Sequence, residues 1–283
     1  MSTSTDLKSL APEICSLICQ DPILERRDLN SSCFISHSFR REAQRLLSYR
    51  FPFLRGAGRI KAWCLSLKRR PHLALGVRDL VLLMPQQVAF HADATIARLT
   101  QALSMCINLK ELTVLSQSRR RRSQQDYSTS MYMFGELPFK LTKFVNDYFN
   151  QDAELGKFLS SQMTLETLQL HSGAHYQLRY VYLPYLQTLA CPAHLFDELS
   201  HIHVRRLRLN FELKAPVPYE AAMLNSHYRF RRYRAGLTSL AIFLKRKPDG
   251  RHSHFLEVMD FVSEWLPCIT HLQIHQFLPI VRP

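Results

Sequence analysis

Glycine is scarce in this chain, with eight residues among 283. The sequence contains no glycine-rich phosphate loop, no Gly-x-Ser-x-Gly turn and no His-Glu-x-x-His helix. These are common signatures of nucleotide binding, serine hydrolysis and zinc proteolysis, so none of these activities is indicated. Isolated Ser, His and Asp residues do not indicate a particular reaction unless a motif brings them together. We therefore expect no catalytic residues, no cofactor and no enzymatic activity.

Long apolar runs and paired cysteines are also missing. No stretch approaches the roughly 20 apolar residues of a membrane span, and the first residues lack the basic start and apolar run of a secretion signal. Seven cysteines, an odd number without close pairing, favour a reducing compartment. We expect a protein of the cytoplasm, the nucleus or both, without a membrane partner.

Metal-ligand patterns are weak. Cys15 and Cys19 are four residues apart and would share a helix face, but no second pair lies at a suitable distance, so apolar packing is the favoured interpretation. The histidine pairs are scattered and lack a third ligand. They are His171 and His175, His201 and His203, and His252 and His254. We predict no metal site.

Acidic residues are few, because 37 Lys and Arg face 23 Asp and Glu, which gives a net charge of +14. Such a charge attracts acidic proteins or nucleic acid, and we favour the acidic protein. Two runs concentrate the basic residues: Arg119, Arg120, Arg121 and Arg122; and Arg229, Arg231, Arg232 and Arg234. The first lies in a polar insertion and is interpreted as a loop or a nuclear import signal. The second alternates with aromatic residues, which suits either base stacking or an amphipathic helix.

A six-residue frame, apolar-x-x-apolar-x-apolar, recurs along the chain. Clear copies start at Leu109, Leu165, Val204 and Ile269, less regular copies at Val77, Leu186 and Leu237, and a weak copy at Leu141. The central residues are Leu80, Leu112, Phe144, Leu168, Leu189, Leu207, Leu240 and Leu272. The intervals between them are one structural repeat long, or one repeat with an inserted loop. Each frame is therefore predicted to be a strand.

Amphipathic helices are expected between the frames. Ile96, Leu99, Leu103 and Cys106 share one helical face before the frame at Leu109. Leu155, Phe158 and Leu159 precede the frame at Leu165 in the same way, and Phe255, Leu256, Met259, Val262 and Trp265 precede that at Ile269. Alternating strands and helices of this kind predict an α/β leucine-rich solenoid with parallel strands.

The polar positions of such frames face solvent or a partner. We expect Lys110, Glu111, Glu166, Arg205 and Arg206 to lie on this face and to contact a target, the alternative being a solvated strand face. The Asn or Cys that regular leucine-rich repeats carry three residues after the frame is absent from the seven clearer copies. The solenoid is therefore expected to be irregular.

The N-terminal residues predict three short helices within about 40 residues, which is small for independent folding. The sequence of this segment resembles the F-box motif over residues 7 to 51. The matching residues are Leu10, Pro12, Glu13, Ile14, Asp28, Leu29, Phe34, Ile35, Ser36 and Phe39. Ala11 and Ser32 depart from the motif, since Pro and Leu are usual there. An F-box followed by leucine-rich repeats is a known arrangement, and this chain resembles the divergent examples of mushroom-forming fungi.

The resemblance implies a substrate receptor of a ubiquitin ligase built from a Skp-type adaptor, a cullin and an F-box protein. It implies that Leu10, Pro12, Ile14, Leu29 and Ile35 meet the adaptor while the repeats bind an unknown target. The expected domains are the F-box-like module at residues 7–51, a helical link at 52–74 and the solenoid at 75–283. Alternatively the N-terminal helices only cap a repeat scaffold or a basic nucleic-acid-binding protein. A cap would bury Pro12 and Ile14, whereas an adaptor site would leave them open.

Overall fold

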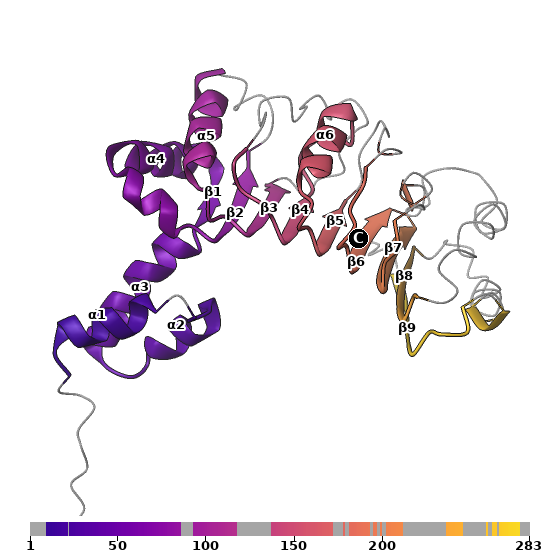
Figure 1. Cartoon of the computed structure of the whole chain (residues 1–283), viewed down its shortest axis with the longest axis horizontal. Coiled ribbons are helices and arrows are strands. Elements are labelled where there is room, and N and C mark those ends of the chain that lie inside the picture. Colours follow the sequence, from indigo (N-terminus) through magenta and orange to yellow (C-terminus); the bar gives the residue numbers. More distant parts are fainter. Residues whose placement is uncertain are drawn as a thin grey trace, which may run out of the picture. The chain divides into compact units, whose positions relative to one another are not determined.

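The computed structural model describes residues 10–21, 23–85, 93–117, 137–171, 178, 181–192, 195–196, 199, 202–211, 236–245, 259, 262–264 and 266–277. Over these residues the chain is an α/β protein with a nine-stranded parallel sheet, its strands in chain order, and several helices (Figure 1). The chain divides into two compact units. Unit 1 comprises residues 1–118 and 137–139, and unit 2 comprises 119–136 and 140–283.

Unit 1 begins with three helices: α1 (Pro12–Gln20), α2 (Arg26–Ser32) and α3 (His37–Arg50). Pro12 occupies the first turn of α1, where a missing N–H costs nothing. Ser36 caps α3 by accepting a hydrogen bond from the Phe39 N–H through its side-chain oxygen. Their shared core consists of Cys15, Cys19, Leu29, Phe39, Ala43 and Leu46. The three N-terminal helices expected from the sequence are present.

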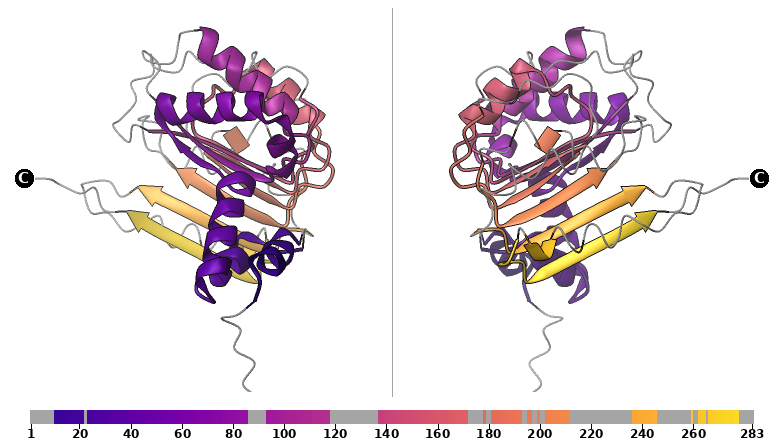
Figure 2. Two further views of the ribbon diagram at one scale, coloured as in Figure 1. Left: turned by 90° about the vertical axis from the view of Figure 1, so that its left-hand side faces the viewer. Right: turned by 90° about the vertical axis from the view of Figure 1, so that its right-hand side faces the viewer.

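The sheet of unit 1 contains β1 (Phe53–Arg55), β2 (Asp79–Met84) and β3 (Glu111–Ser116). Between them lie α4 (Gly56–Arg69), the 3-10 helix η2 (Pro71–Gly76) and α5 (Asp93–Met105). In this unit α4 and α5 lie on the same side of the sheet (Figure 2). Gly56 follows β1 directly and has φ +78°, a backbone conformation that only glycine adopts without cost.

Residues 52–74 contain more than the helical link expected from the sequence. α4 provides the helix, but β1 precedes it and pairs in parallel with β2, Leu54 lying opposite Leu82. This segment therefore opens the sheet. Its three-residue strand escaped detection because it is too short to show the six-residue frame.

Unit 2 contains the remaining six strands: β4 (Lys143–Asn146), β5 (Thr167–Leu170), β6 (Thr188–Pro192), β7 (Arg206–Phe211), β8 (Ser239–Lys245) and β9 (His271–Phe277). Helix α6 (Ala153–Ser161) joins β4 to β5, and its N-cap Asp152 accepts hydrogen bonds from the N–H groups of Glu154 and Leu155. Figure 2 shows β7, β8 and β9 running in the same direction.

Each of the eight frames coincides with a strand, which starts at the third residue of the frame. The central apolar residues pair with one another: Leu80 with Leu112 in unit 1, and Phe144, Leu168, Leu189, Leu207, Leu240 and Leu272 in succession in unit 2. Because the side-chain period of a strand is two, this register puts the apolar residues of all strands of a unit on one face. The predicted strand positions and the parallel pairing of the strands are confirmed.

The helices predicted before the frames at Leu109 and Leu165 are α5 and α6. Leu99, Leu103 and Cys106 are fully buried, as are Leu155 and Leu159. The helix predicted before Ile269 lies partly outside the described residues. Within the described part, residues 259 and 262–264 are helical. Val262 is buried as predicted, whereas Met259 is 39% exposed. No helix among the described residues is long and apolar enough to cross a membrane.

The weak frame at Leu141 departs from the others at its last position. Asn146 stands where an apolar residue is expected and is 1% exposed. Its side-chain oxygen accepts hydrogen bonds from the N–H groups of Tyr148 and Phe149, and its Nδ2 donates to the Phe149 carbonyl. The amide thus satisfies the buried backbone of the turn that leaves β4.

Candidate functional site

The first candidate site is an exposed apolar set on the N-terminal helices. On α1, Ile14, Leu17 and Ile18 are 46%, 71% and 44% exposed, while Cys15 and Cys19 on the opposite side are fully buried. The helix is therefore apolar on both sides, although only one side enters the described core. An apolar helix face left in solvent is uncommon unless it meets a partner.

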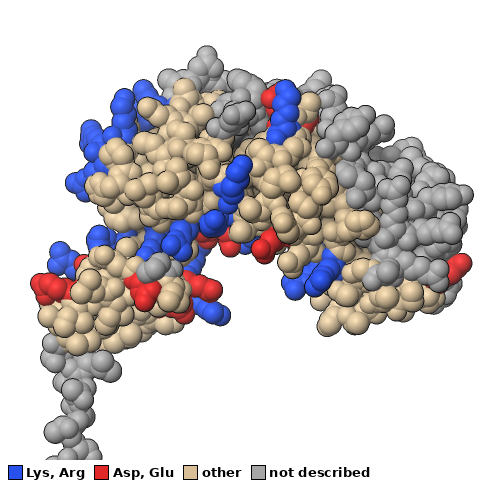
Figure 3. Space-filling view, in the orientation of Figure 1, with Lys and Arg blue, Asp and Glu red and all other residues tan. Residues whose placement is uncertain are grey.

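The turns between the N-terminal helices extend this set. Ile23, which follows α1, is 82% exposed, and Phe34 and Ile35, which lie between α2 and α3, are 83% and 48% exposed. We call Ile14, Leu17, Ile18, Ile23, Phe34 and Ile35 the N-terminal apolar set. The part of α1–α3 that faces the viewer in Figure 3 includes a broad area without acidic or basic side chains.

The five residues expected at the adaptor contact differ in their exposure to solvent. Pro12, Ile14 and Ile35 are exposed, and Leu10 is half-buried against the helical core. Leu29 is fully buried in that core and presents no exposed surface to a partner in this conformation. Leu17 and Ile18 were not among the contacts expected from the sequence, although their helical spacing from Ile14 is the signal that identifies this face.

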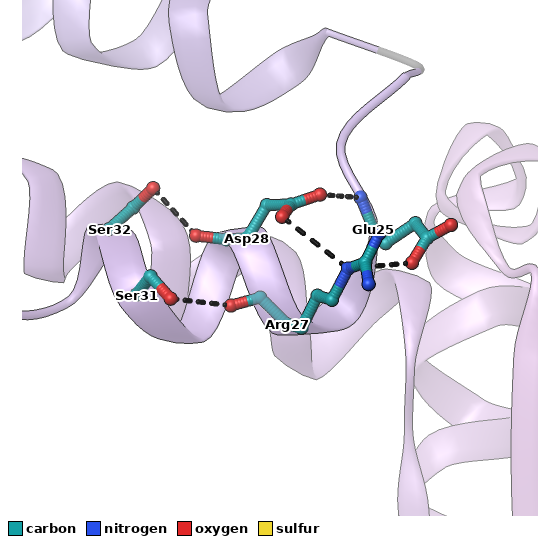
Figure 4. A network of polar contacts seen from close by, with 5 residues as sticks. All are labelled: Glu25, Arg27, Asp28, Ser31 and Ser32. Atoms are coloured by element: carbon teal, nitrogen blue, oxygen red, sulfur yellow. Dashed lines mark hydrogen bonds and ion pairs between the residues drawn. The ribbon is translucent and has the colours of Figure 1, made fainter.

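Polar contacts fix α2, which carries Asp28 and Leu29 of the motif (Figure 4). Asp28 accepts a hydrogen bond from the Glu25 N–H at 2.9 Å, and Arg27 pairs with Glu25 at 3.1 Å. Ser32, which replaces the usual Leu, donates its hydroxyl to the Asp28 carbonyl at 2.9 Å. Its polar group is thus satisfied within the helix, and α2 forms with Ser32 in place.

The second candidate site is the outward strand face within each unit, where the predicted target contacts lie at the first residue of a strand or just before it. Lys110 is exposed and Glu111 half-buried in unit 1, while Glu166, Arg205 and Arg206 are exposed in unit 2. In unit 2 the backbone links the loops before successive strands, since the Gln187 N–H donates to the Glu166 carbonyl and the Arg205 N–H to that of Gln187. The expected exposure is present for Lys110, Glu166, Arg205 and Arg206 but only in part for Glu111. Contact of these residues with a target stays a prediction.

Arginines gather at β7. Arg206 and Arg208 alternate with the buried Leu207 and Leu209, so both point to the outward face next to Arg205. Within the described residues no carboxylate lies within 4.0 Å of these three arginines. Figure 3 shows a compact group of basic side chains by the lower edge of this part of unit 2.

An aromatic stack adjoins these arginines. The Arg208 guanidinium carbon lies 3.9 Å from the centroid of the Phe243 ring on β8. On β9, His275 lies opposite Phe243 in register, with ring centroids 4.5 Å apart and an angle of 10° between the rings. The stack was not expected from the sequence, because Phe243 and His275 each follow the last residue of their frame and Arg208, although inside its frame, was not among the selected polar positions. The signal available in the sequence was the alternation of inward and outward side chains, continued along each strand past the end of the frame.

The remaining predicted basic residues, Arg119, Arg120, Arg121, Arg122, Arg229, Arg231, Arg232 and Arg234, lie outside the described residues, as do His175, His201, His252 and His254. Among the residues that the structure does describe, no group of three or more His, Cys, Asp or Glu side chains is placed to hold a metal ion. Cys15 and Cys19 pack into the helical core, the role favoured from their spacing.

The buried thiols are not activated. Burial raises the pKa of Cys64 to about 11 and that of Cys106 to about 12, and it also raises the pKa of Cys191. A raised pKa keeps a thiol protonated near neutrality, whereas nucleophilic cysteines need the thiolate. These cysteines therefore serve packing.

Comparison with known proteins gives no relative: no protein-family description matches the chain, and neither the curated proteins nor the solved structures searched contain a match.

Proposed function

We propose that this protein is the substrate receptor of a Skp, cullin and F-box type ubiquitin ligase. The three N-terminal helices act as the F-box and dock on the adaptor, and the parallel-stranded remainder is an irregular leucine-rich solenoid that holds a target protein. The receptor carries out no chemistry. It raises the effective concentration of the target near a ubiquitin-charged enzyme, in the cytoplasm or the nucleus.

The observation that carries the proposal is the exposed N-terminal apolar set. Leu17, Ile23 and Phe34 are each more than 70% exposed, in a small helical module that already has a buried core of its own. Burying one large apolar side chain in an interface contributes about 1.5–3 kcal/mol. Several such residues together provide enough free energy to hold an apolar partner surface.

The main alternative is that these helices only cap the sheet. A cap would bury Pro12 and Ile14 within the chain, but both are exposed, which favours the docking function. The helices are joined to the sheet part of unit 1 by other residues: the Arg78 N–H donates to the Arg50 carbonyl, and Arg26 lies 3.9 Å from Asp79. The same module can therefore be attached to the sheet and keep an open apolar face.

The sheet supports the receptor half of the proposal. Its strands pair in parallel and in chain order, as those of a solenoid would, and the outward strand positions carry polar and charged residues such as Arg206, Gln169 and Gln273. Exposed strand faces are the usual binding surfaces of repeat proteins. The direct binding of nucleic acid remains the alternative for this basic chain.

The test is co-purification of the full chain with a Skp-type adaptor. The informative variant is Leu17→Asp with Phe34→Asp, because both side chains are exposed and their replacement leaves the helical core intact. The matched control is Leu75→Asp with Ile107→Asp, two apolar residues of unit 1 outside the N-terminal helices that are 49% and 51% exposed.

The proposal expects the wild type and the control to capture the adaptor, and the Leu17→Asp and Phe34→Asp variant to lose it while keeping its circular dichroism spectrum. Failure of the folded wild type to capture the adaptor overturns the proposal. Equal loss in the control would mean non-specific apolar adhesion and overturns it as well.

A further inference from the structure

The outward face of β7, β8 and β9 differs in charge from the sheet face of unit 1. Its described residues are Arg206, Arg208, Asn210, Ser239, Ala241, Phe243, His271, Gln273 and His275, and none is acidic. The outward face of β2 and β3, by contrast, carries Asp79 and Glu111 at the position that Arg206 holds in β7. The face of β7–β9 is therefore complementary to an anionic partner.

The register gives this face three rows. Arg206 and Arg208 on β7 pair with Ser239 and Ala241 on β8, and these pair with His271 and Gln273 on β9. The short side chains of the middle row lie between longer ones, and the outer strands are about 9.6 Å apart because neighbouring strands are about 4.8 Å apart. An extended peptide backbone fits over such a middle row.

The distance between the two arginines along β7 further restricts which anionic ligands match this face. Arg206 and Arg208 are two residues apart on one strand, which separates them by about 6.6 Å. Acidic side chains at alternate positions of an extended peptide have the same separation. Each guanidinium can then meet one carboxylate through two parallel hydrogen bonds.

Arg208 is held in place before any ligand arrives. Its guanidinium lies over the Phe243 ring, and the His275 ring stacks on Phe243, with the distances of 3.9 and 4.5 Å given above. Arginine stacked on an aromatic ring keeps its N–H donors free at its edge. Ordering Arg208 in advance lowers the entropy lost on binding.

We infer that the face of β7–β9 binds an extended acidic segment of a partner protein, with Asp or Glu at alternate positions facing Arg206 and Arg208. The inference rests on the proposed function, because it names the chemical class of the target that the receptor would hold. Phe243 and His275 lie beside Arg208 on this surface, and Gln273 is placed to hydrogen-bond the peptide backbone.

The experiment is fluorescence anisotropy with the full chain and a labelled peptide of alternating Glu and Thr. The matched peptide has Gln in place of Glu. We expect the Glu peptide to bind at least about tenfold more tightly, since hydrogen bonds between charged partners exceed neutral ones. Arg206→Gln with Arg208→Gln should remove this preference, and Phe243→Leu should reduce it by about threefold through the loss of the stack.

The control variant is Arg59→Gln with Arg69→Gln, which removes the same charge from exposed positions on α4. It should bind the Glu peptide as the wild type does. Equal binding of the Glu and Gln peptides overturns the inference, as does equal weakening by the control, which would indicate net charge alone. Tighter binding of single-stranded DNA than of the peptide, dependent on Arg206 and Arg208, would also overturn it.

Adaptor capture separates this inference from the proposed function. If the Arg206→Gln and Arg208→Gln variant and the wild type both capture the adaptor while the Glu peptide fails to bind, only the acidic-segment inference is overturned. If the peptide binds as expected but the wild type does not capture the adaptor, the binding surface stands and the ligase function is overturned.

Discussion

Arg50, the last residue of α3, donates a 2.6 Å hydrogen bond from its guanidinium to the carbonyl oxygen of Gln20, the last residue of α1. A second bond reaches the Asp21 carbonyl at 3.1 Å. Burial, followed by the charge of nearby Arg78, lowers the pKa of Arg50, but an arginine stays charged at neutral pH. A cation at the carbonyl end of a helix satisfies groups that the helix itself leaves unpaired.

Replacing Arg50 should therefore loosen the N-terminal helices. We expect Arg50→Met to lower the free energy of unfolding by about 1.5–3 kcal/mol, the range for hydrogen bonds to charged groups. Urea unfolding followed by circular dichroism measures this change. Arg41→Met, at an exposed position of the same helix, is the control and should change stability little. Equal stability of both variants would show that the two carbonyl contacts contribute nothing.

Leu29 and Leu17 should respond in opposite ways to truncation. Leu29→Ala should cost about 2–5 kcal/mol because it opens a cavity in the helical core. Leu17→Ala should change stability by less than about 0.5 kcal/mol, as is usual for exposed positions. Urea unfolding checks stability, and adaptor capture checks binding, which Leu17→Ala should weaken in a folded protein. A stable Leu29→Ala variant would contradict the position of this side chain.

Asn146 should resist replacement by the apolar residue that the sequence frame favours. Asn146→Val completes the frame but removes the side-chain oxygen that accepts hydrogen bonds from the buried N–H groups of Tyr148 and Phe149. Each buried unsatisfied group costs about 1–3 kcal/mol. We expect a loss of about 2–4 kcal/mol in urea unfolding, whereas Thr167→Val, at a half-buried outward strand position, should be nearly neutral. A more stable Asn146→Val protein would contradict the turn described here.

The exposed and the buried cysteines should differ strongly in their reactivity toward a thiol-labelling reagent. At pH 8 the exposed Cys268 should react with a maleimide in the native protein, whereas Cys64, Cys106 and Cys191 should react only after unfolding. Mass spectrometry of the labelled peptides identifies the sites. Rapid native labelling of Cys64 or Cys106 would show that these residues are accessible.

Alkaline pH should destabilise the protein through the same thiols. Because Cys64 has a pKa of about 11 when folded, above the ordinary value near 9, the folded state binds more protons than the unfolded state between these values. The stabilisation is complete below about pH 9 and is lost as the pH rises toward 11. Cys64→Ala should make this part of the pH dependence shallower in urea unfolding.

Much of the sheet could be predicted from the sequence alone. Each frame placed its central apolar residue, and pairing of those residues then set the register, because a shift by one residue would turn the apolar face of a strand into solvent. β1 escaped this reasoning since a three-residue strand carries too little pattern. Asn146 escaped it because the need for a polar group arises from a turn whose buried amides only the structure reveals.

The candidate sites divide in the same way. Alternation along β7 determined that Arg206 and Arg208 share a face, and helical spacing determined that Ile14, Leu17 and Ile18 do. Only the tertiary structure decided that this side of α1 remains in solvent while Leu29 is buried, and that Arg208 meets Phe243 from a strand more than thirty residues away. Periodicity assigns residues to a face, but which face is covered, and which distant side chains share it, depends on how the elements pack against one another.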